Sequence, residues 1–405
     1  MQVIHASISA AWSLFHATEN STMTEICIVA AKRTPIGRFL GALKDQSAVD
    51  LACAAGAAAL HGLDPALIDQ VIVGNVIGSG LGMNVARQVG VRLGLPVSVP
   101  AYSVNMMCAS GMQAVLLAAQ AIKAGDARVV LCGGTESMSN APYLLPRARS
   151  GLKFGDAALV DALLKDGLVD AFDQRHMAFT AESLAVKYGI TRAEQDEFSL
   201  RSQQRYESAR AAGRFAEELV AFDKLDRDEH ARAETTLAGL AGLKPAFDPQ
   251  GSVTAGNASG INDGAAMLVV AKRDVARQNG WPVLAVLESG ATCGCDPKLM
   301  GLGPVHAIRK LVERDGLDLS SLDTIEINEA FAVQTLACVR ELSLDESRLN
   351  PDGGAIAMGH PIGASGARLI VHLAHKLSRG DGSRALAALC VGGGQGAAVL
   401  LRAAR

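Results

Sequence analysis

Cys108 lies where the sequence predicts a turn between a strand and a helix. Val97–Asn105 has the pattern of a strand entering a tight turn, and Met112–Ala124 is an apolar, alanine-rich run typical of a helix. We therefore expect a helix that begins at the cysteine. Free backbone N–H groups and the positive end of a helix dipole lower the pKa of a thiol at such a position. Cys108 is therefore either a nucleophile or, like most free cysteines, a small buried hydrophobic residue.

His360 and Cys390 occupy similar positions near the C-terminus. His360 lies between a glycine and a proline, in a glycine-rich turn before a predicted helix at Ala367–Leu377. A histidine in such a turn has no strand or helix face to pack, which favours a role in a site. Ala385–Gly396 predicts a buried strand that carries Cys390 into a loop of glycines, where backbone N–H groups can approach a ligand closely.

Two thiols and one imidazole at the ends of regular elements indicate acyl-transfer chemistry. One thiol would carry the acyl group, the imidazole would activate that thiol, and the second thiol would move a proton.

Composition limits the alternatives. A chain of 405 residues is longer than one typical core, so two or more domains are expected. The net charge of −3, with both signs interspersed, does not indicate nucleic-acid binding, and no apolar run is long enough to span a membrane. Cys293-Gly-Cys295 has no second cysteine pair or nearby histidines, so it indicates zinc only weakly. Scattered cysteines fit reduced thiols in the cytoplasm.

Apolar strand-like runs alternate with helical patterns in the first part of the chain, which predicts a mostly parallel α/β sheet. The predicted elements are strands at Ile26–Ala30, Gln70–Val76 and Val129–Cys132 and helices at Val49–His61 and Val85–Leu93.

A weak internal repeat indicates duplication. The segment that starts at Leu63 resembles the one that starts at Leu317, 254 residues later (317 − 63 = 254). His360 follows Cys108 at nearly the same spacing (360 − 108 = 252). Two similar halves packed face to face would bring both helix starts to one pseudo-symmetric centre.

The segment 138–261 has a different composition and holds much of the charge, with a predicted helix at Arg192–Gly213. We interpret it as an insertion. The predicted organisation is an N-terminal extension outside the fold (1–22), a first half (23–137, completed by 262–283), the insertion (138–261) and a second half (284–405).

Six motifs, in this order, resemble those of the thiolase family, most closely its acetoacetyl-CoA thiolases. They are Cys108-Ala-Ser-Gly-Met, Gly133-Gly-Thr-Glu-Ser-Met-Ser, Ala255-Gly-Asn-Ala-Ser-Gly-Ile-Asn-Asp-Gly-Ala-Ala, Asn328-Glu-Ala-Phe-Ala, Gly359-His-Pro-Ile-Gly-Ala-Ser-Gly and Cys390-Val-Gly-Gly-Gly.

The resemblance implies a fold and an activity. The fold is an α/β architecture of duplicated βαβαβαββ halves in a five-layer α-β-α-β-α sandwich, with an inserted loop domain that binds coenzyme A. The activity is the reversible condensation of two acetyl-CoA molecules to acetoacetyl-CoA and CoA. Acyl-CoA thioesters are then substrates, no cofactor or metal is expected, and the chain forms a homo-oligomer, either a dimer or a dimer of dimers.

The resemblance also assigns catalytic roles. Cys108 carries the acetyl group, His360 accepts its proton and Cys390 is the base that removes the α-proton. Asn328 holds a water in one oxyanion hole with His360, and the N–H groups of Cys108 and Gly392 form a second. From its position alone, Asn328 could instead be a helix N-cap.

His176 and Met177 match a pair that lines the acyl pocket of short-chain thiolases, although a histidine there is more often exposed on the surface. Met177 would limit chain length, but Ala178 stands where the family has glycine, and Gly239 stands where it has a serine near the adenine. The remaining positions that match the coenzyme A and substrate site are Leu168, Arg232, Phe247, Ala258, Ser259, Met300 and Phe331.

Three alternatives remain. One is a degradative 3-ketoacyl-CoA thiolase of broader chain length. Another is a ketoacyl synthase, which uses one cysteine and two histidines, so Cys390 disfavours it. The third is a non-catalytic acyl-CoA- or lipid-binding relative, which should lack Cys108, His360 or Cys390.

Overall fold

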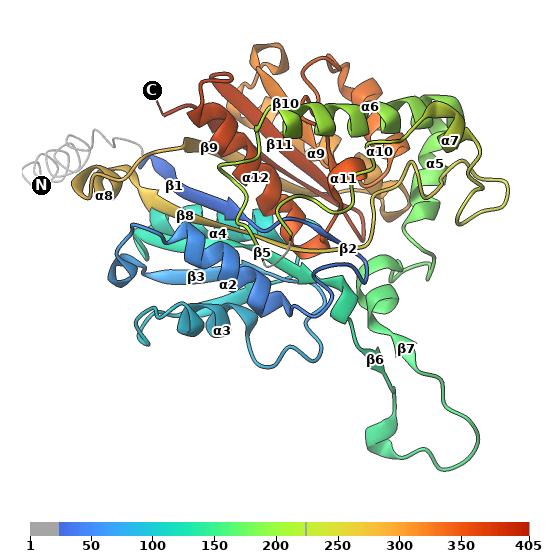
Figure 1. Cartoon of the computed structure of the whole chain (residues 1–405), viewed down its shortest axis with the longest axis horizontal. Helices are drawn as coiled ribbons and strands as arrows, with labels where there is room; N and C mark the ends of the chain where they lie inside the picture. The colour runs from blue at the N-terminus through green and yellow to red at the C-terminus, as the bar shows by residue number, and fades with distance from the viewer. Residues whose placement is uncertain (1–23, 223–224, 405) are drawn as a thin grey trace, which may run out of the picture.

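The computed structural model describes residues 24–222 and 225–404 (Figure 1). The predicted N-terminal extension 1–22 therefore lies outside the described residues. The first half contains β1 (Ile26–Arg33), β2 (Gly37–Arg38), α2 (Ala48–Ala59), β3 (Gln70–Gly74), α3 (Val85–Arg92), β4 (Ala101–Val104), α4 (Ser110–Ala124), β5 (Val129–Ser137), β8 (Asn262–Lys272) and α8 (Arg273–Gln278). The second half contains β9 (Ala285–Gly294), α9 (Gly303–Asp315), β10 (Thr324–Ile327), α10 (Ala332–Leu342), α11 (Ala355–Met358), α12 (Ile362–Ser378), β11 (Arg384–Val391) and β12 (Gln395–Arg402).

The strands of the two halves follow equivalent orders, β3-β5-β8-β1 and β10-β11-β12-β9, with β4 added at the edge of the first half, and the halves join where β1 pairs with β9. The expectation of a mostly parallel sheet is wrong. Only the pairs β3–β4, β3–β5 and β10–β11 are parallel, because each half ends with a strand, β8 or β12, that returns antiparallel to its neighbours.

Alternating side chains divide the molecule into layers. On β5, Val130 and Cys132 point into the central core with α4 and α12, whereas Val129 and Leu131 point to the outer core with α2 and α3. Alternate side chains of β11 and β12 in the second half likewise point into the central core or into an outer core. The helices α9 and α10 cover that outer face. The fold is therefore the expected five-layer sandwich, with α4 and α12 in the middle layer (Figure 1).

The sequence repeat corresponds to a structural one. Asp64 and Asp318, 254 positions apart, each cap a short 3₁₀ turn by accepting the N–H two residues later. The strands β3 and β10 follow these turns, and α4 and α12 start 252 positions apart, at Ser110 and Ile362. The end of β5 and the end of β11 correspond as well, so Glu136 and Cys390 occupy equivalent places (390 − 136 = 254).

Small residues let the two central helices approach each other closely. A Cβ on Gly111 would lie 2.9 Å from the Cβ of Ala367, and one on Gly366 would lie 2.7 Å from the Cβ of Met112. A Cβ on Gly134 would lie only 2.1 Å from the carbonyl oxygen of Gly363. This close approach brings the starts of α4 and α12 together at the pseudo-symmetric centre.

Three predicted boundaries differ from the structure. The strand before Cys108 is only Ala101–Val104, and α4 begins at Ser110 and not at the cysteine. The helix α12 begins at Ile362, five residues before its predicted start, because its buried first turn needs small residues that resemble a loop in sequence. The predicted strand Ala385–Gly396 is two strands, β11 and β12, with a glycine turn between them.

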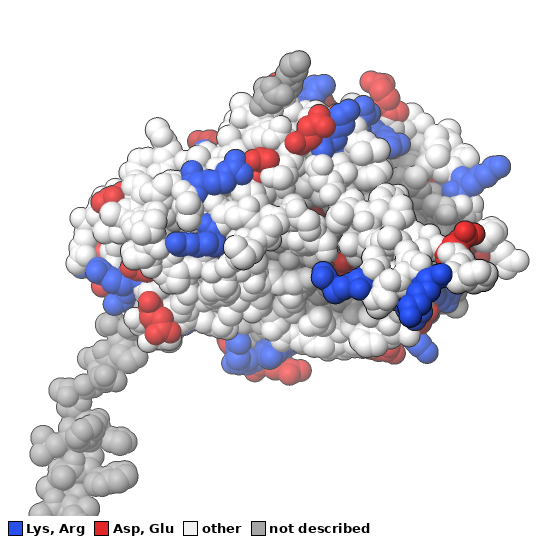
Figure 2. All heavy atoms as spheres, turned by 90° about the horizontal axis from the view of Figure 1, so that it is seen from below, with Lys and Arg blue, Asp and Glu red and all other residues white. Residues whose placement is uncertain are grey.

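The segment 138–261 contains the short strands β6 (Tyr143–Leu144) and β7 (Val160–Asp161) and the helices α5 (Ala178–Tyr188), α6 (Arg192–Ala211) and α7 (Leu237–Ala241). Its β6–β7 part extends away from the body of the molecule (Figure 1). Over the described residues, none of the helices has the length and apolarity needed to cross a membrane. Charges of both signs are interspersed on the face shown in Figure 2, which offers no extended area of one sign.

Candidate active site

Cys108 lies in the turn between β4 and α4. The turn is tight: the N–H of Ala109 donates to the carbonyl of Met106, and that of Ser110 to the carbonyl of Met107. Met107 has a φ of 46°, an unfavourable left-handed conformation for a methionine. A strained residue directly before a candidate nucleophile is typical of functional turns, where the rest of the fold enforces the strain.

The environment of Cys108 does not lower its pKa, contrary to the expectation. Burial raises the pKa of the thiol to about 11, although the backbone N–H groups of Gly392 and of Cys108 itself act on the sulfur in the opposite direction. The resting enzyme therefore holds a thiol and not a thiolate. A proton acceptor must act as the sulfur attacks.

His360 is the candidate acceptor, and its contact with Ser365 favours one tautomer of the ring. The hydroxyl of Ser365 donates to the carbonyl of Pro361 at 2.9 Å, so its oxygen is left to accept from the Nδ1–H of His360 at 2.6 Å. The other ring nitrogen, Nε2, is then unprotonated. Burial, followed by the charge of Arg368, lowers the pKa of His360 to about 3, which keeps the imidazole neutral.

Asn262 fixes the backbone at His360. Its Oδ1 accepts the N–H of His360 at 2.9 Å, and its Nδ2 donates to the carbonyl of Gly37 at 2.9 Å. Gly359, with a φ of 108°, lies against the same amide, and a Cβ there would be 2.5 Å from the Asn262 side chain. Only glycine fits this close approach.

Asn328 follows β10 directly and reaches the histidine. Its side-chain nitrogen lies 3.4 Å from Nδ1 of His360, and its Oδ1 is buried without a partner among the described residues. The alternative role as an N-cap is wrong, because Phe331 occupies the N-cap position of α10. Oδ1 of Asn328 is thus available to accept a hydrogen bond from another donor, such as a water.

Glu329 connects the segments that surround Asn328. Its carboxylate accepts from Ser202 Oγ at 2.6 Å, Asn350 Nδ2 at 2.8 Å and the N–H of Ile356 at 3.1 Å. These contacts tie the Asn328 turn to α6 and to the segment that leads to His360.

Cys390 is the last residue but one of β11 and is buried. Burial raises its pKa well above the ordinary value, and the neighbouring sulfur of Cys108 acts in the same direction. The glycine turn follows immediately. A Cβ on Gly392 would lie 3.5 Å from Cε of Met107 and 3.7 Å from Sδ of Met177, so two methionines border this turn.

Glu136, the structural counterpart of Cys390, is a buried carboxylate at the same centre. It accepts from the side chain of Asn75 and from the N–H groups of Val76, Ile77 and Gly363, all within 2.9–3.1 Å. All four partners are donors, which favours the ionised form, while burial raises the pKa to about 7. The carboxylate thereby ties the first turn of α12 to the end of β3.

The predicted acyl and coenzyme A residues lie on the side of the inserted segment. The half-buried ring of His176 stacks on Phe247 with centroids 4.3 Å apart. Ala258 bridges to Phe331, and the N–H of Ser259 donates to Ala330 at 3.0 Å. One buried apolar cluster, shared by the inserted segment and the second half, contains Met177, Met300, Phe331 and Cys390. The backbone carbonyl of Leu168 accepts the N–H of Met177 at 2.9 Å.

Arg232 lies apart from this group, in a pocket of about 260 Å³. His230 and Gln203 line the same pocket, and so does Gly239, where the family has a serine. The pocket therefore has a basic side chain but no hydroxyl at position 239. Within the described ranges, no three His, Cys, Asp or Glu side chains are grouped as a metal site would require.

Sequence reasoning missed Ser365, Asn262 and Glu136, although all three lie inside the quoted motifs. A serine five residues after a histidine, across a helix start, is the one local signal that could have identified Ser365. The contacts of Asn262 and Glu136 join segments 59 or more residues apart, so only the fold reveals them.

Comparisons with known proteins agree over nearly the whole chain. The family model described as thiolase, N-terminal domain, matches residues 26–274, and that of the thiolase, C-terminal domain, matches 281–403. An acetyl-CoA acetyltransferase of Pseudomonas aeruginosa is 50% identical over 94% of this chain and 99% of its own length. One of Cupriavidus necator is 48% identical over 93% and 99%. The human mitochondrial 3-ketoacyl-CoA thiolase structure in complex with CoA aligns with a TM-score of 0.92 at 46% identity, covering 94% of this chain and 98% of that one.

Proposed function

The chain belongs to the thiolase family of acyltransferases, and we propose that it catalyses the reversible condensation of two acetyl-CoA molecules to acetoacetyl-CoA and CoA. The observation that carries this proposal is that two thiols, one from each half of the duplicated fold, act on one another electrostatically, while a buried neutral histidine precedes the central helix α12. Relatives named acetyl-CoA acetyltransferase support the choice of substrate.

The first half-reaction transfers an acetyl group to Cys108. The thiol gives its proton to Nε2 of His360 as its sulfur attacks the thioester carbonyl, and the N–H groups of Cys108 and Gly392 stabilise the oxyanion. The bond between the carbonyl carbon and the CoA sulfur then breaks. Cys390 gives its proton to the departing CoA thiolate and is itself left as a thiolate.

The second half-reaction forms the carbon–carbon bond. The Cys390 thiolate removes an α-proton from a second acetyl-CoA, and the protonated His360, with a water held by Asn328, stabilises the enolate oxygen. The enolate carbon attacks the acetyl group on Cys108. The Cys108 sulfur leaves and takes back its proton from His360, so every group returns to its starting state.

This sequence requires no metal or redox cofactor, because the thioester itself acidifies the α-carbon. It does require Cys108 and Cys390 as free thiols, which supports a reducing compartment such as the cytoplasm. The pocket at Arg232 is a basic site that suits the phosphate-bearing, adenine end of CoA.

We also propose that the chain works as a homo-oligomer, a dimer or a dimer of dimers. The strand β4 ends the sheet order and leaves one edge unpaired, and such edges pair readily with another chain. Beside it, Met83 is 90% exposed and Val97 is 80% exposed. These exposed apolar side chains support a contact with a second copy.

A degradative 3-ketoacyl-CoA thiolase of broader chain length is the second candidate, because a solved structure of that name aligns as closely as any reported above. Thiolysis of 3-ketoacyl-CoA substrates of rising length separates the two. Our proposal predicts the highest kcat/KM for acetoacetyl-CoA and a decline at six carbons and beyond.

Met177→Ala supplies the matching variant. It should improve kcat/KM for the six-carbon substrate about 10-fold, because a hydrophobic pocket discriminates only modestly per methylene. A wild-type preference for eight or ten carbons would replace our proposal with the degradative one.

A further inference from the structure

One face of α12 is polar although the helix lies in the centre of the molecule. Ser365, Arg368, His372 and Lys376 follow one another at spacings of three and four residues, so they share a face, and all four are buried. The other side chains of α12 are mainly aliphatic and belong to the central core. Ser365 contacts the ring of His360, so this polar face begins at the active site.

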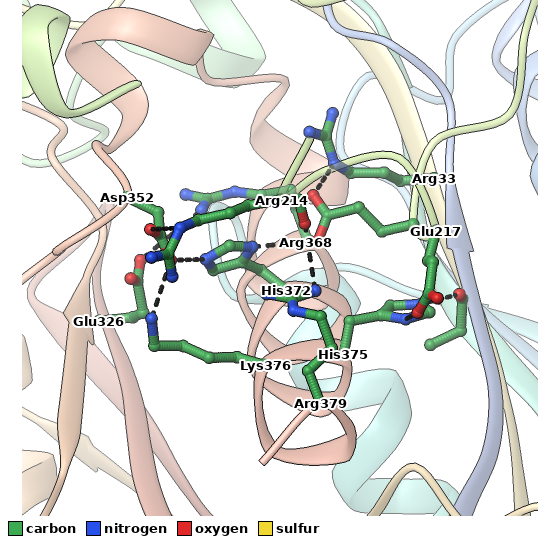
Figure 3. A network of polar contacts seen from close by, with 12 residues as sticks. Arg33, Arg214, Glu217, Glu326, Asp352, Arg368, His372, His375, Lys376 and Arg379 are labelled. Atoms are coloured by element: carbon green, nitrogen blue, oxygen red, sulfur yellow. Dashed lines mark hydrogen bonds and ion pairs between the residues drawn. The ribbon is translucent and has the colours of Figure 1, made fainter. Parts of the chain in front are cut away.

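His372 is held between two carboxylates from other segments. Its Nδ1 lies 3.0 Å from Oε2 of Glu218, and its Nε2 lies 3.2 Å from Oδ2 of Asp352 (Figure 3). Both carboxylates are themselves buried. A carboxylate accepts hydrogen bonds, so two carboxylates on one imidazole require both ring nitrogens to donate, which is possible only for the protonated imidazolium.

The neighbours of His372 complete a buried cluster. Lys376 Nζ lies 2.9 Å from Asp352 Oδ2, and Arg368 lies 3.8 Å from Glu326 of β10. Arg214, which is 42% exposed, lies 3.6 Å from the other oxygen of Asp352 on the solvent side. The buried charged members of the cluster are Arg33, Glu218, Asp228, Glu326, Asp352, Arg368, His372 and Lys376.

The charges of the buried members balance only when His372 carries a proton; Arg214, which is partly in solvent, is not counted among them. The buried carboxylates are Glu218, Asp228, Glu326 and Asp352, and the other buried cations are Arg33, Arg368 and Lys376.

The pKa directions agree with this balance. Burial alone would lower the pKa of His372, but the Glu218 carboxylate outweighs it and raises the pKa to about 9. Burial raises the pKa of Glu326 to about 7. Four cations therefore face four anions between about pH 7 and pH 9.

The apolar contacts of α12 are close but non-directional. The interface with α4, which follows Cys108, consists of small residues such as Gly111, Gly366 and Ala367. Glu136 accepts a hydrogen bond from the first turn of α12, at Gly363, but it does not contact the rest of the polar face. Charged pairs at defined distances resist an axial shift of the helix, because each one fixes a point on the helix to another segment.

We propose that His372, as a buried imidazolium between Glu218 and Asp352, is a positioning residue that fixes α12 along its axis and thereby places His360 against Cys108. The inference rests on the proposed function, since its readout is the thiolase reaction. His372 touches neither substrate nor the reacting atoms. It acts through the helix whose first turn holds the ring of the catalytic histidine.

The test compares three variants with the wild type in acetoacetyl-CoA thiolysis from pH 6 to pH 10.5. His372→Gln removes the proton-bearing ring and leaves one uncompensated negative charge. The double variant His372→Gln/Glu218→Gln restores the charge balance without a group that titrates there. His375→Gln is the matched control, because His375 is buried on the same helix but donates from Nε2 to the carbonyl of Ala31 at 2.8 Å. Its one ion-pair contact, 3.7 Å from Nδ1 to Glu217, is to a carboxylate outside the eight buried members of the cluster.

We expect kcat of His372→Gln to fall about 10- to 100-fold at pH 8 with KM within about twofold, because misplacing a catalytic group slows chemistry more than binding. The wild type and His375→Gln should lose kcat as the pH rises through about 9. The double variant should recover most of kcat and lose that alkaline decline. If His372→Gln does not fold, the pH profile of the double variant still tests whether His372 causes the loss of kcat above about pH 9.

Two results would overturn the proposal. One is an alkaline decline that is the same in the wild type and the double variant. The other is a His372→Gln enzyme that is folded and retains wild-type kcat. A wild type without thiolase activity would instead overturn the proposed function, so the two failures are distinguishable.

Discussion

At the scale of the residue, the structure gives the site a neutral resting state. Burial raises the pKa of Cys108 to about 11 and lowers that of His360 to about 3, so the thiol and the imidazole are both uncharged at neutral pH. The proton therefore moves as the sulfur attacks the thioester. This state depends on Ser365, which holds the proton of His360 on Nδ1 and leaves Nε2 to act as the base.

Ser365→Ala tests the role of that hydroxyl. Without it, the imidazole loses the group that selects its tautomer, and we expect kcat to fall about 10- to 100-fold, less than the roughly 100- to 10,000-fold that loss of the general base itself costs. KM should change little, because the serine is buried away from the CoA pocket. Steady-state thiolysis at pH 8 measures both parameters. Unchanged kcat would show that Ser365 does not set the tautomer.

Cys390→Ala should separate the two half-reactions. Acetylation of Cys108 needs less from Cys390 than removal of the α-proton does, so acetylation should survive better than condensation. Exchange of the α-hydrogens of acetyl-CoA with deuterated water should fall by about 100-fold or more. NMR follows that exchange, and undiminished exchange would remove Cys390 as the base.

The site residues were predictable from sequence to different degrees. Cys108, His360 and Cys390 stand out because each follows a predicted strand or precedes a predicted helix beside glycines. The expectation of a lowered thiol pKa at Cys108 was wrong, because it considered the helix terminus and not the burial of the sulfur. Glu136 was not predictable, since its donors come from two distant segments, 75–77 and Gly363, that only the fold brings together.

At the scale of the element, the starts of α4 and α12 set the geometry. Both helices lie in the middle layer, and their first turns pack against strand ends through glycines. The sequence predicted both helices but placed the start of α12 five residues late, at Ala367 and not Ile362. The reason is physical: a helix start that must touch backbone uses glycine and alanine, which resemble a loop in sequence.

Gly134→Ala tests this close approach. Its Cβ would lie 2.1 Å from the carbonyl oxygen of Gly363, which is backbone and cannot move without α12. We expect a loss of stability of about 1–3 kcal/mol, as for other overpacked sites, and a fall in kcat larger than the loss of folded protein explains. Urea unfolding and thiolysis at one temperature give both values. Gly94→Ala is the control for a glycine-to-alanine change without a steric clash. No atom lies within 4 Å of a Cβ there, although its φ of 74° adds some strain.

At the scale of the whole molecule, the duplication and the five layers were predictable, and the strand directions were not. The repeat beginning at Leu63 and Leu317 identified equivalent halves, which the equivalent strand orders confirm. The alternation of strands and helices suggested a mostly parallel sheet. It could not reveal that β8 returns antiparallel, because the connection before β8 runs through the long insertion. The antiparallel return of β12 was missed because the glycines 392–394, a hairpin turn, were interpreted only as a ligand loop.

The buried cluster around His372 makes stability depend on pH. The folded pKa of about 9 lies above the ordinary value of about 6.5, so the stabilising contribution is fully present below pH 6.5 and is lost as the pH rises through 9. The difference corresponds to about 3 kcal/mol. Against the effect of burial, Arg33 and then His372 lower the pKa of Glu218 to about 2; the His372 part is the same contact and is not added again.

Urea unfolding at intervals from pH 6 to pH 10.5 measures this dependence. The free energy of unfolding of the wild type should decline above about pH 8, and that of the charge-balanced variant His372→Gln/Glu218→Gln should decline less over the same range. Parallel declines would show that His372 is not the group responsible.

The central claim is that Cys108 carries the acetyl group, and mass spectrometry of the intact and digested protein tests it most directly. After incubation with acetyl-CoA and rapid acid quenching, the account predicts one added acetyl group, located on the peptide that contains Cys108. Cys108→Ala should remain folded, acquire no acetyl group and show no turnover. An acetyl group found only on the Cys390 peptide, or normal turnover by Cys108→Ala, would contradict the account.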